Sequence, residues 1–382
     1  MKVLFFLRRI GPYHHARFQA AAASMDIVAV ETRPSSEEYS WQFKANGKYK
    51  IESFAVSTDP EAGLRGNELK KSITGLLDKY KPDVLVNTGW ADAEYNQIVV
   101  EAAPRKIPLV VISDSRLEAV TRKFYVERMK RVMLRAYSSA LVAGTESTEY
   151  ITGLGFDRRA VFKPWDVVDN DVFTQAGRAP RSPYDERKFV CIGRFIEEKN
   201  LHRMIDGYAG YVRAGGSRKL VLAGGGKLKS SLEEKIRAHN LTAHVEMYDF
   251  VQQDVILQLL GQAFALVLPS ISDQWGLAVN EAMAFGLPVV VSSRCGCAVD
   301  LVKEGRNGVI FDPYNISAIT DSLMRMDKAG EEQWNSMCKE SQLEISNWGL
   351  NEFATGLADA CSYALASPSK GTFTLLHKFL AR

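Results

Sequence analysis

The chain has 382 residues, 46% of them hydrophobic and 24% charged, a composition typical of folded protein and not of disordered segments. Its length fits about two domains, each large enough to bury its own core. The net charge of +3 is too small to indicate nucleic-acid binding, and five scattered cysteines do not predict a disulfide framework.

The chain opens with MKVLFFLRRIG, in which the apolar run is too short for the core of a signal peptide and precedes its arginines. We interpret this run as a first β-strand. No stretch approaches the roughly 20 apolar residues that cross a bilayer. We therefore expect a cytoplasmic protein, with peripheral contact to the inner face of the membrane as an open alternative.

Short apolar runs alternate with longer amphipathic segments, which is typical of strand–helix units built on a parallel sheet. The predicted strands of the first half are 3–6, 27–30, 83–87, 109–112 and 140–142. Those of the second half are 189–192, 220–223, 245–247, 266–268, 289–291 and 309–311. We predict an α/β fold in which two doubly wound sheets face each other across a cleft, with ligands at the carboxyl ends of the strands.

Residues 163–171 (KPWDVVDND) and the polar stretch with Pro180 and Pro183 have the composition of a linker. The expected division is an N-terminal domain over 1–165, a linker over 166–187, a C-terminal domain over 188–346 and a helical segment over 347–382. Packing of that last segment against the N-terminal domain is one option for it.

Two acidic residues flank a predicted loop-to-helix junction in the second domain. Asp273 lies in the loop after strand 266–268, and Glu281 lies on a helix over 276–285 that Gly286-Leu287-Pro288 ends. Such a helix directs free N–H groups and its positive dipole end toward the strand ends, where a diphosphate could bind. The two carboxylates can then contact opposite ends of one ligand.

Two cations follow another strand of the same domain. Strand 189–192 ends at Gly193-Arg194, and Lys199 comes five residues later. Arginine suits a bidentate contact with phosphate and lysine a point charge. Together they could neutralise a leaving diphosphate.

The segments GRFIEEKN (193–200) and DQWGLAVNEAMAFGLPVVVS (273–292) resemble two motifs of the family-4 glycosyltransferases, and the likeness covers nearly the whole chain. The family implies the GT-B fold, with two facing Rossmann-like domains. It implies that Arg194 and Lys199 hold the diphosphate, Asp273 the transferred sugar and Glu281 the ribose. It also implies donor contacts from Gly193, Gly276, Leu277 and the glycine turn with Gly225.

The resemblance implies retaining, metal-independent transfer from a nucleoside-diphosphate sugar to an acceptor hydroxyl, without a cofactor. A UDP-sugar is favoured over GDP-mannose, in cell-surface polysaccharide or glycolipid assembly. Two departures are Asp273, where the family commonly has Glu, and Asp114, where many members have a histidine after a strand like 109–112. An epimerase of the same fold, or a non-catalytic nucleotide- or glycan-binding protein, stays open as an alternative.

Acceptor candidates lie in the first domain. Gly11, His14 and His15, with Arg17, open a helix after the first strand and could contact acceptor or donor phosphate, or have a purely structural role. Trp90 follows another strand and could stack on a sugar or belong to the core.

Three further features have alternative explanations. Asp169-Asn170-Asp171 matches a metal-binding D-x-D pattern, but it falls in the predicted linker, and Cys295-Gly296-Cys297 lacks a second ligand pair, so we predict no metal site. A basic amphipathic helix is predicted where Arg122-Lys123 and residues 128–135 surround an apolar face of Tyr125, Met129, Val132, Met133 and Ala136. We favour packing of this face on the sheet, with contact to anionic lipid as the alternative. The segment 373–380 raises the same question.

Overall fold

The computed structural model describes residues 1–34, 47–55, 63–90, 92–117, 123–368 and 375–381. These residues divide into two compact units. Unit 1 takes its described residues from 1–117, 123–167 and 350–381, and unit 2 takes its from 168–349.

In the described part of unit 1, seven parallel strands form one sheet in the order β3-β2-β1-β4-β5-β6-β7. The strands are β1 (Lys2–Leu7), β2 (Asp26–Glu31), β3 (Lys50–Ser53), β4 (Val84–Thr88), β5 (Leu109–Ser113), β6 (Ser139–Val142) and β7 (Val161–Phe162). The helices are α1 (Pro12–Ala21), α2 (Gly66–Tyr80), α3 (Ala93–Arg105), α4 (Phe124–Leu134), α5 (Thr145–Gly153), α14 (Leu350–Ala366) and α15 (Leu375–Leu380).

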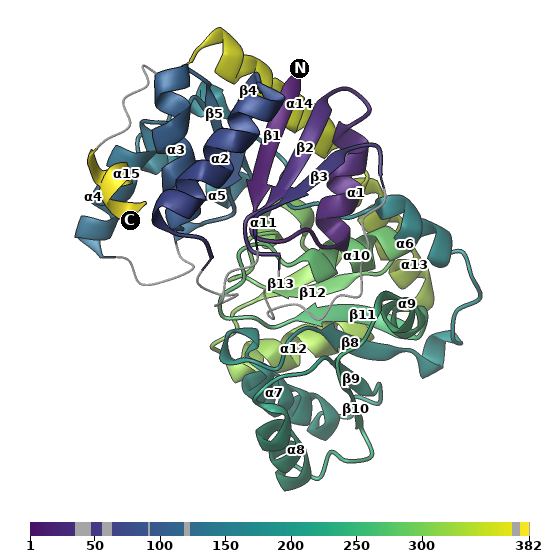
Figure 1. Ribbon diagram of the computed structural model, residues 1–382. Helices are drawn as coiled ribbons and strands as arrows, with labels where there is room; N and C mark the ends of the chain where they lie inside the picture. Colours follow the sequence, from purple (N-terminus) through teal and green to yellow (C-terminus); the bar gives the residue numbers. More distant parts are fainter. Residues whose placement is uncertain (35–46, 56–62, 91, 118–122, 369–374, 382) are drawn as a thin grey trace. The chain divides into compact units, whose positions relative to one another are not determined.

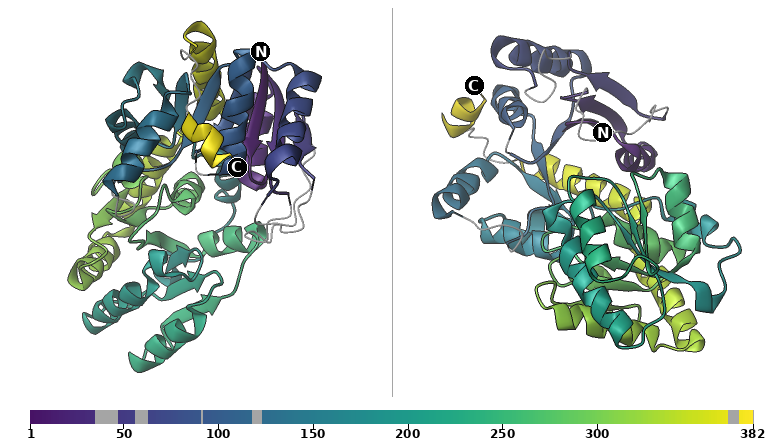
Figure 2. Two further views of the ribbon diagram at one scale, coloured as in Figure 1. Left: turned by 60° about the vertical axis from the view of Figure 1, so that its left-hand side comes forward. Right: turned by 90° about the horizontal axis from the view of Figure 1, so that it is seen from below.

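Alternate residues of β1 enter different cores on the two faces of this sheet. Leu4 and Phe6 join a cluster with α2, α3 and α5, whereas Val3 and Phe5 join a cluster with α1 and α14. Figures 1 and 2 show α14 on the face opposite to α2 and α3. Both faces are therefore covered, which explains why the strands of this parallel sheet are continuous apolar runs.

In the described part of unit 2, six parallel strands follow the order β10-β9-β8-β11-β12-β13. The strands are β8 (Lys188–Ile192), β9 (Leu220–Ala223), β10 (Val245–Tyr248), β11 (Ala263–Leu268), β12 (Val289–Ser292) and β13 (Gly308–Phe311). The helices are α6 (Asn170–Ala176), α7 (Leu201–Arg213), α8 (Lys229–Ala238), α9 (Gln253–Gly261), α10 (Leu277–Phe285), α11 (Ala298–Leu301), α12 (Ile316–Asp327) and α13 (Glu331–Ile345).

The predicted α/β class and every predicted strand are confirmed, with boundaries shifted by at most a few residues. Strands β3 and β7, at the two edges of the unit 1 sheet, were not predicted. Residues 168–187, expected in a linker, belong to unit 2. They pack there because Thr174 donates to the carbonyl of Ala284 at 3.1 Å and Arg181 donates to the carbonyl of Gly286 at 3.0 Å.

Candidate functional site

In unit 2 the strand order reverses between β8 and β11. The chain turns to β9 and β10 on one side and to β12 and β13 on the other. Segments that follow β8 and β11 therefore leave the same edge of the sheet in opposite directions, and doubly wound sheets typically bind their ligands at such a point. The segments are 193–200 and 269–276, which contain the predicted cations and Asp273.

Lys199 and Asp273 form an ion pair at this edge. Lys199 Nζ lies 2.5 Å from Asp273 Oδ2, and the two side chains are 21% and 14% exposed. Ser270 Oγ donates to the same carboxylate oxygen at 3.3 Å. Burial of the ammonium lowers the pKa of Lys199, but the charge of Asp273 and its hydrogen bond outweigh burial and raise the pKa above the ordinary value. Lys199 therefore stays cationic at neutral pH.

Glycines let three loops approach one another beneath this pair. The Lys199 side chain crosses Gly193, where an added Cβ would lie 3.5 Å from Lys199 Cε. Gly224 has φ +147°, and an added Cβ would meet the carbonyl oxygen of Gly193 at 2.0 Å. Phe195 N donates to the carbonyl of Gly225 at 2.7 Å. The glycine turn after β9 thus supports the backbone that carries Arg194 and Lys199.

The loop that carries Asp273 is held by the segment after β12. Asp273 and Cys295 form an isolated parallel bridge, in which Gly296 N donates to the carbonyl of Asp273 at 3.1 Å. The next residue, Cys297, donates its N–H to the carbonyl of Trp275, which lies two residues after Asp273, at 3.1 Å. These backbone bonds fix the loop and leave the Asp273 carboxylate directed at Lys199.

Helix α10 begins directly after this loop. Gly276 precedes the helix with φ +105°, and an added Cβ would meet Leu268 Cδ2 at 2.7 Å, so the turn requires glycine. At the start of α10, Val279 N donates to the carbonyl of Gly276 at 2.9 Å, and helix geometry leaves the N–H groups of Leu277 and Ala278 without a partner inside the helix. Glu281 lies one turn further along and is 4% exposed.

Asn200 was not among the predicted site residues, although it lies in the GRFIEEKN segment. Its backbone is left-handed, with φ +56°, and its side chain is buried. Nδ2 donates to the carbonyls of Pro269 at 3.1 Å and Pro313 at 2.9 Å. Asn200 therefore ties the loops after β8, β11 and β13 together, and only its place beside Lys199 could have indicated this role.

Arg194 and Phe250 present exposed side chains at the same edge of unit 2. Arg194 follows Gly193 at the end of β8. Phe250, which the sequence analysis did not single out, is 52% exposed and lies beside Gly225, whose added Cβ would be 3.8 Å from Phe250 Cβ. The edge thus carries an exposed arginine after β8 and an exposed aromatic ring after β10.

The predicted acceptor residues of unit 1 lie at the start of α1. Gly11 N donates to His14 Nδ1 at 3.3 Å, and His15 Nδ1 lies 2.9 Å from the hydroxyl of Tyr49. Burial, and after it the charge of Arg17, lowers the pKa of His14 to about 3. His14 is therefore a neutral ring at physiological pH and cannot act there as a cation.

Of the two roles left open for Arg17, a ligand contact and a structural role, the packing of its side chain supports the structural one. Its side chain is 2% exposed, and Nη2 donates to the carbonyl of Val167 at 2.9 Å and to Asp166 at 3.4 Å. The guanidinium also lies 4.5 Å from the centre of the Trp165 ring. Arg17 therefore links α1 to residues 165–167, the last residues of unit 1 before unit 2 begins.

Asp114 and Trp90 follow β5 and β4. Asp114 is exposed, and its carbonyl accepts a bond from Ser147 Oγ at 3.1 Å. Trp90 is partly buried against the core of unit 1, and Lys130 Nζ lies 5.9 Å from the centre of its ring. Asp114 is thus accessible, while the Trp90 ring is partly committed to packing.

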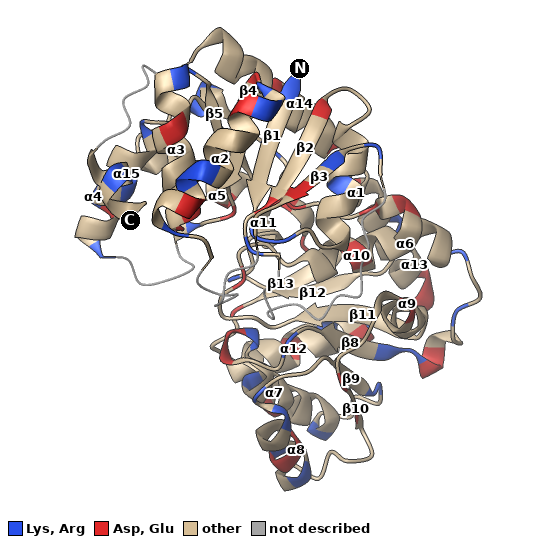
Figure 3. Cartoon of the chain, in the orientation of Figure 1, with Lys and Arg blue, Asp and Glu red and all other residues tan. Residues whose placement is uncertain are grey.

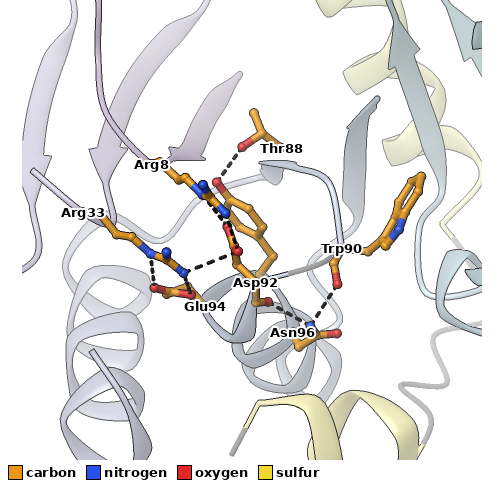
Figure 4. A network of polar contacts seen from close by, with 8 residues as sticks. Arg8, Arg33, Thr88, Trp90, Asp92, Glu94 and Asn96 are labelled. Atoms are coloured by element: carbon orange, nitrogen blue, oxygen red, sulfur yellow. Dashed lines mark hydrogen bonds and ion pairs between the residues drawn. The ribbon is translucent and has the colours of Figure 1, made fainter. Parts of the chain in front are cut away.

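A polar network that the sequence analysis missed lies at the switch point of unit 1, between β1 and β4. Arg8, just after β1, makes two bonds of 2.8 Å to Asp92, which follows β4 (Figure 4). Arg33, after β2, donates to Glu94 at 2.9 Å and lies 3.4 Å from Asp92. Glu94 is fully buried. A cation after one central strand thus pairs with an aspartate after the other, as Lys199 and Asp273 do in unit 2.

The described residues give less support to the other candidate sites. Among the described residues no group of three metal-ligating side chains occurs, and Asp169 instead accepts a bond from Asp171 N at 3.2 Å to cap α6. A cavity of about 350 Å³ in unit 1 lies at the amino ends of β6 and β7, away from the carboxyl edge. No helix in the described ranges is long and apolar enough to span a membrane.

The chain is similar in sequence to glycosyltransferases. The family model of "Glycosyl transferases group 1" matches residues 174–339. An uncharacterized glycosyltransferase of Methanocaldococcus jannaschii is 28% identical over 169 residues, 44% of this chain and 38% of that protein, so the chain spans about two fifths of this relative. Glycogen synthase of Mycobacterium tuberculosis is 25% identical over 338 residues, which cover 81% of this chain and 80% of the synthase.

The fold has close structural counterparts. The crystal structure of HepE from Anabaena in complex with UDP superposes with a TM-score of 0.72 at 17% identity, over 95% of this chain and 100% of HepE. The match extends across both units, whereas the family model covers residues of unit 2.

Proposed function

We propose, from the premise that this chain is a group 1 glycosyltransferase with the GT-B fold, that it transfers a sugar with retention from a UDP-sugar to an acceptor hydroxyl. The observation that carries the proposal is the Lys199–Asp273 pair at the switch point of unit 2, directly before the N-terminus of α10. Cation, carboxylate and helix terminus meet where a parallel α/β sheet binds its ligands.

Each residue has a chemical task in this proposal. Arg194, Lys199 and the α10 N–H groups hold the diphosphate, so the charge that neutralises it comes from the protein and not from a metal. Asp273 binds hydroxyls of the transferred sugar, and Glu281 binds the ribose. Gly193, Gly225 and Gly276 let the backbone approach the donor.

In the reaction, the bond between the anomeric carbon and the diphosphate oxygen breaks, and the oxygen keeps the electron pair. The acceptor oxygen forms the new bond to the anomeric carbon, and its proton passes to the departing phosphate. Negative charge grows on the diphosphate as this happens, so cations fixed beforehand stabilise the transition state more than the ground state.

The acceptor side of the proposal rests on unit 1. The carboxyl edge of its sheet carries Gly11, His14 and His15 after β1 and Asp114 after β5. Trp90 follows β4, which lies between β1 and β5 in the sheet. We propose that hydroxyl groups of a sugar or a lipid-linked glycan bind there, in cell-surface polysaccharide or glycolipid assembly.

The preference for UDP is supported by a structural neighbour whose structure holds UDP. A direct test incubates the full chain with a panel of nucleotide sugars and a mixture of lipid-linked and free glycans, and follows product by mass spectrometry. A glycosylated acceptor whose new linkage has the donor's anomeric configuration supports the proposal. An epimerised nucleotide sugar formed without acceptor, or an inverted linkage, would contradict it.

A further inference from the structure

Helix α4 of unit 1 exposes a continuous basic and aromatic face. Phe124, Arg128, Arg131 and Arg135 follow one another at intervals of four, three and four residues, so they lie on one side of the helix. Phe124 is 79% exposed, and the three arginines are exposed as well. The face opposite packs on unit 1 through Met133 and Leu134, which are buried.

The expectation that α4 packs its apolar residues on the sheet holds for only part of them. Met133 and Ala136 are buried, but Tyr125 is 59% exposed and Met129 is 37% exposed. Large apolar side chains that stay on the surface beside cations need a physical explanation.

The C-terminal helix α15 extends this surface. Leu375 and Phe379, one turn apart, are 83% and 72% exposed, whereas His377 and Ala381 are buried. His377 is hydrogen-bonded to the backbone of Met133 in α4, and Figure 1 shows α15 beside α4. Basic residues of both helices are blue in Figure 3. We call the combined exposed set the α4–α15 surface: Phe124, Tyr125, Arg128, Met129, Arg131, Arg135, Leu375, Lys378 and Phe379.

The charge of this surface is of one sign. The single acidic residue of α4, Glu127, turns toward the protein, where it binds Lys130 at 2.9 Å and the hydroxyl of Tyr150 at 2.8 Å. Arg131 also donates to the carbonyl of Gly153 at 3.0 Å, which holds its guanidinium at the helix surface.

We propose that the α4–α15 surface docks this protein on an anionic lipid bilayer. Exposed aromatic and aliphatic side chains would enter the boundary between headgroups and acyl chains, and the arginines would contact lipid phosphates. This combination suits an anionic bilayer because apolar insertion and attraction of basic residues act together there. The inference concerns unit 1 alone and does not depend on the donor chemistry proposed for unit 2.

The test is flotation of the full chain with vesicles of phosphatidylcholine, with and without phosphatidylglycerol. We expect binding to the phosphatidylglycerol vesicles only, weakening as salt is raised. The double variant Arg128→Gln/Arg135→Gln should bind about 30-fold more weakly, because each basic residue near an anionic surface contributes about 1 kcal/mol. A matched control, Lys70→Gln/Lys71→Gln on α2, removes two exposed charges of the same unit and should bind like the wild type.

A second variant reports insertion directly. Subtracting the wild-type fluorescence from that of Phe124→Trp isolates the emission of the new tryptophan. This emission should shift to shorter wavelength on phosphatidylglycerol vesicles. Thermal unfolding should stay unchanged, because the side chain is on the surface. Absence of wild-type binding, equal binding by the Arg128/Arg135 variant, an equal loss in the control, or no shift of the new tryptophan would overturn the proposal.

Discussion

In the proposed donor site, the ion pair of Lys199 and Asp273 would be in place before the ligand arrives. The two side chains neutralise each other at 2.5 Å in a largely buried position, so the lysine is charged and fixed in place. A diphosphate can then accept further hydrogen bonds from the Lys199 ammonium group. The remaining lone pairs of the Asp273 carboxylate can accept hydrogen bonds from sugar hydroxyls.

The first prediction concerns Lys199→Met. Loss of a preorganised cation should lower kcat by about a hundredfold to a thousandfold while the Kd for donor changes far less, because the cation acts on charge that develops in the transition state. Lys219→Met, which removes a half-exposed lysine of unit 2, serves as control. Steady-state kinetics and titration calorimetry separate the two effects, and an unchanged kcat in Lys199→Met would refute the role.

The second prediction concerns Arg33 and Glu94 in unit 1. Arg33→Met leaves the fully buried Glu94 without its main partner and should lower the free energy of unfolding of the unit by about 3 to 5 kcal/mol. Arg8→Met removes a half-exposed arginine and should cost about 1 kcal/mol or less. In urea unfolding, the double variant Arg33→Met/Glu94→Leu should recover most of the loss, and failure to recover it would argue against an electrostatic cause.

The third prediction follows from two buried histidines. Burial, then Arg17, lowers the pKa of His14 to about 3, and burial lowers that of His377 to about 4. Below about pH 6.5 the unfolded chain takes up protons on these rings and the folded chain does not, so stability is full above that pH and falls as the pH drops toward 4. In urea unfolding at pH 7 and about pH 5, His14→Asn should lose less stability than the wild type, by at most about 2 kcal/mol. Equal losses would contradict the assignment.

At the scale of elements, glycines decide how closely the loops of the proposed donor site approach one another. Gly276 combines a left-handed backbone with a neighbour that leaves no room for a Cβ, whereas Gly75 lies inside α2 with nothing within 4 Å. The start of α10 and the support of Asp273 therefore both depend on the missing side chain.

The fourth prediction compares these two glycines. Gly276→Ala should destabilise unit 2 by more than about 1 kcal/mol and weaken donor binding, because the strained turn moves the α10 N-terminus. Gly75→Ala should stabilise unit 1 by about 0.5 to 1 kcal/mol. Thermal unfolding with and without UDP measures both, and a neutral Gly276→Ala would show that the turn tolerates a side chain.

The sequence predicted the central elements well because their strands are buried on both faces and so form unbroken apolar runs. It missed β3, whose residues 50–53 are mostly exposed, and β7, which is two residues long. Neither has an apolar run that periodicity can detect. The helix over 276–285 was predicted correctly because Gly276 and Gly286 delimit it.

Candidate site residues could be proposed from the sequence where a motif joined them and not where the fold alone brought them together. Arg194, Lys199, Asp273 and Glu281 belong to two recognisable segments, although the direct Lys199–Asp273 contact was not foreseen. Arg8 and Asp92 are 84 positions apart and belong to no motif. Their only signal was that each follows a predicted strand, as Lys199 and Asp273 do, and the strand order that makes such ends adjacent was not available from the sequence.

For the molecule as a whole, the two units repeat one plan. Each has a parallel sheet whose order reverses between two central strands, with an ion pair between the segments that follow them. In unit 1 Asp92 pairs with both Arg8 and Arg33, and such a network suits a structural role. In unit 2 the pair stands beside glycines and a helix N-terminus, which suits a phosphate ligand.

The measurement that tests the central claim most directly is binding of UDP and UDP-sugars to the full chain by thermal unfolding and calorimetry. We predict that UDP stabilises the wild type, by about 2.7 kcal/mol at a hundred times its Kd, and that Arg194→Met and Glu281→Gln each weaken binding at least tenfold. The Lys70→Gln/Lys71→Gln control should bind like the wild type. No stabilisation of the wild type by any nucleoside diphosphate, or equal binding by both site variants, would contradict a donor site at the carboxyl edge of β8 and β11.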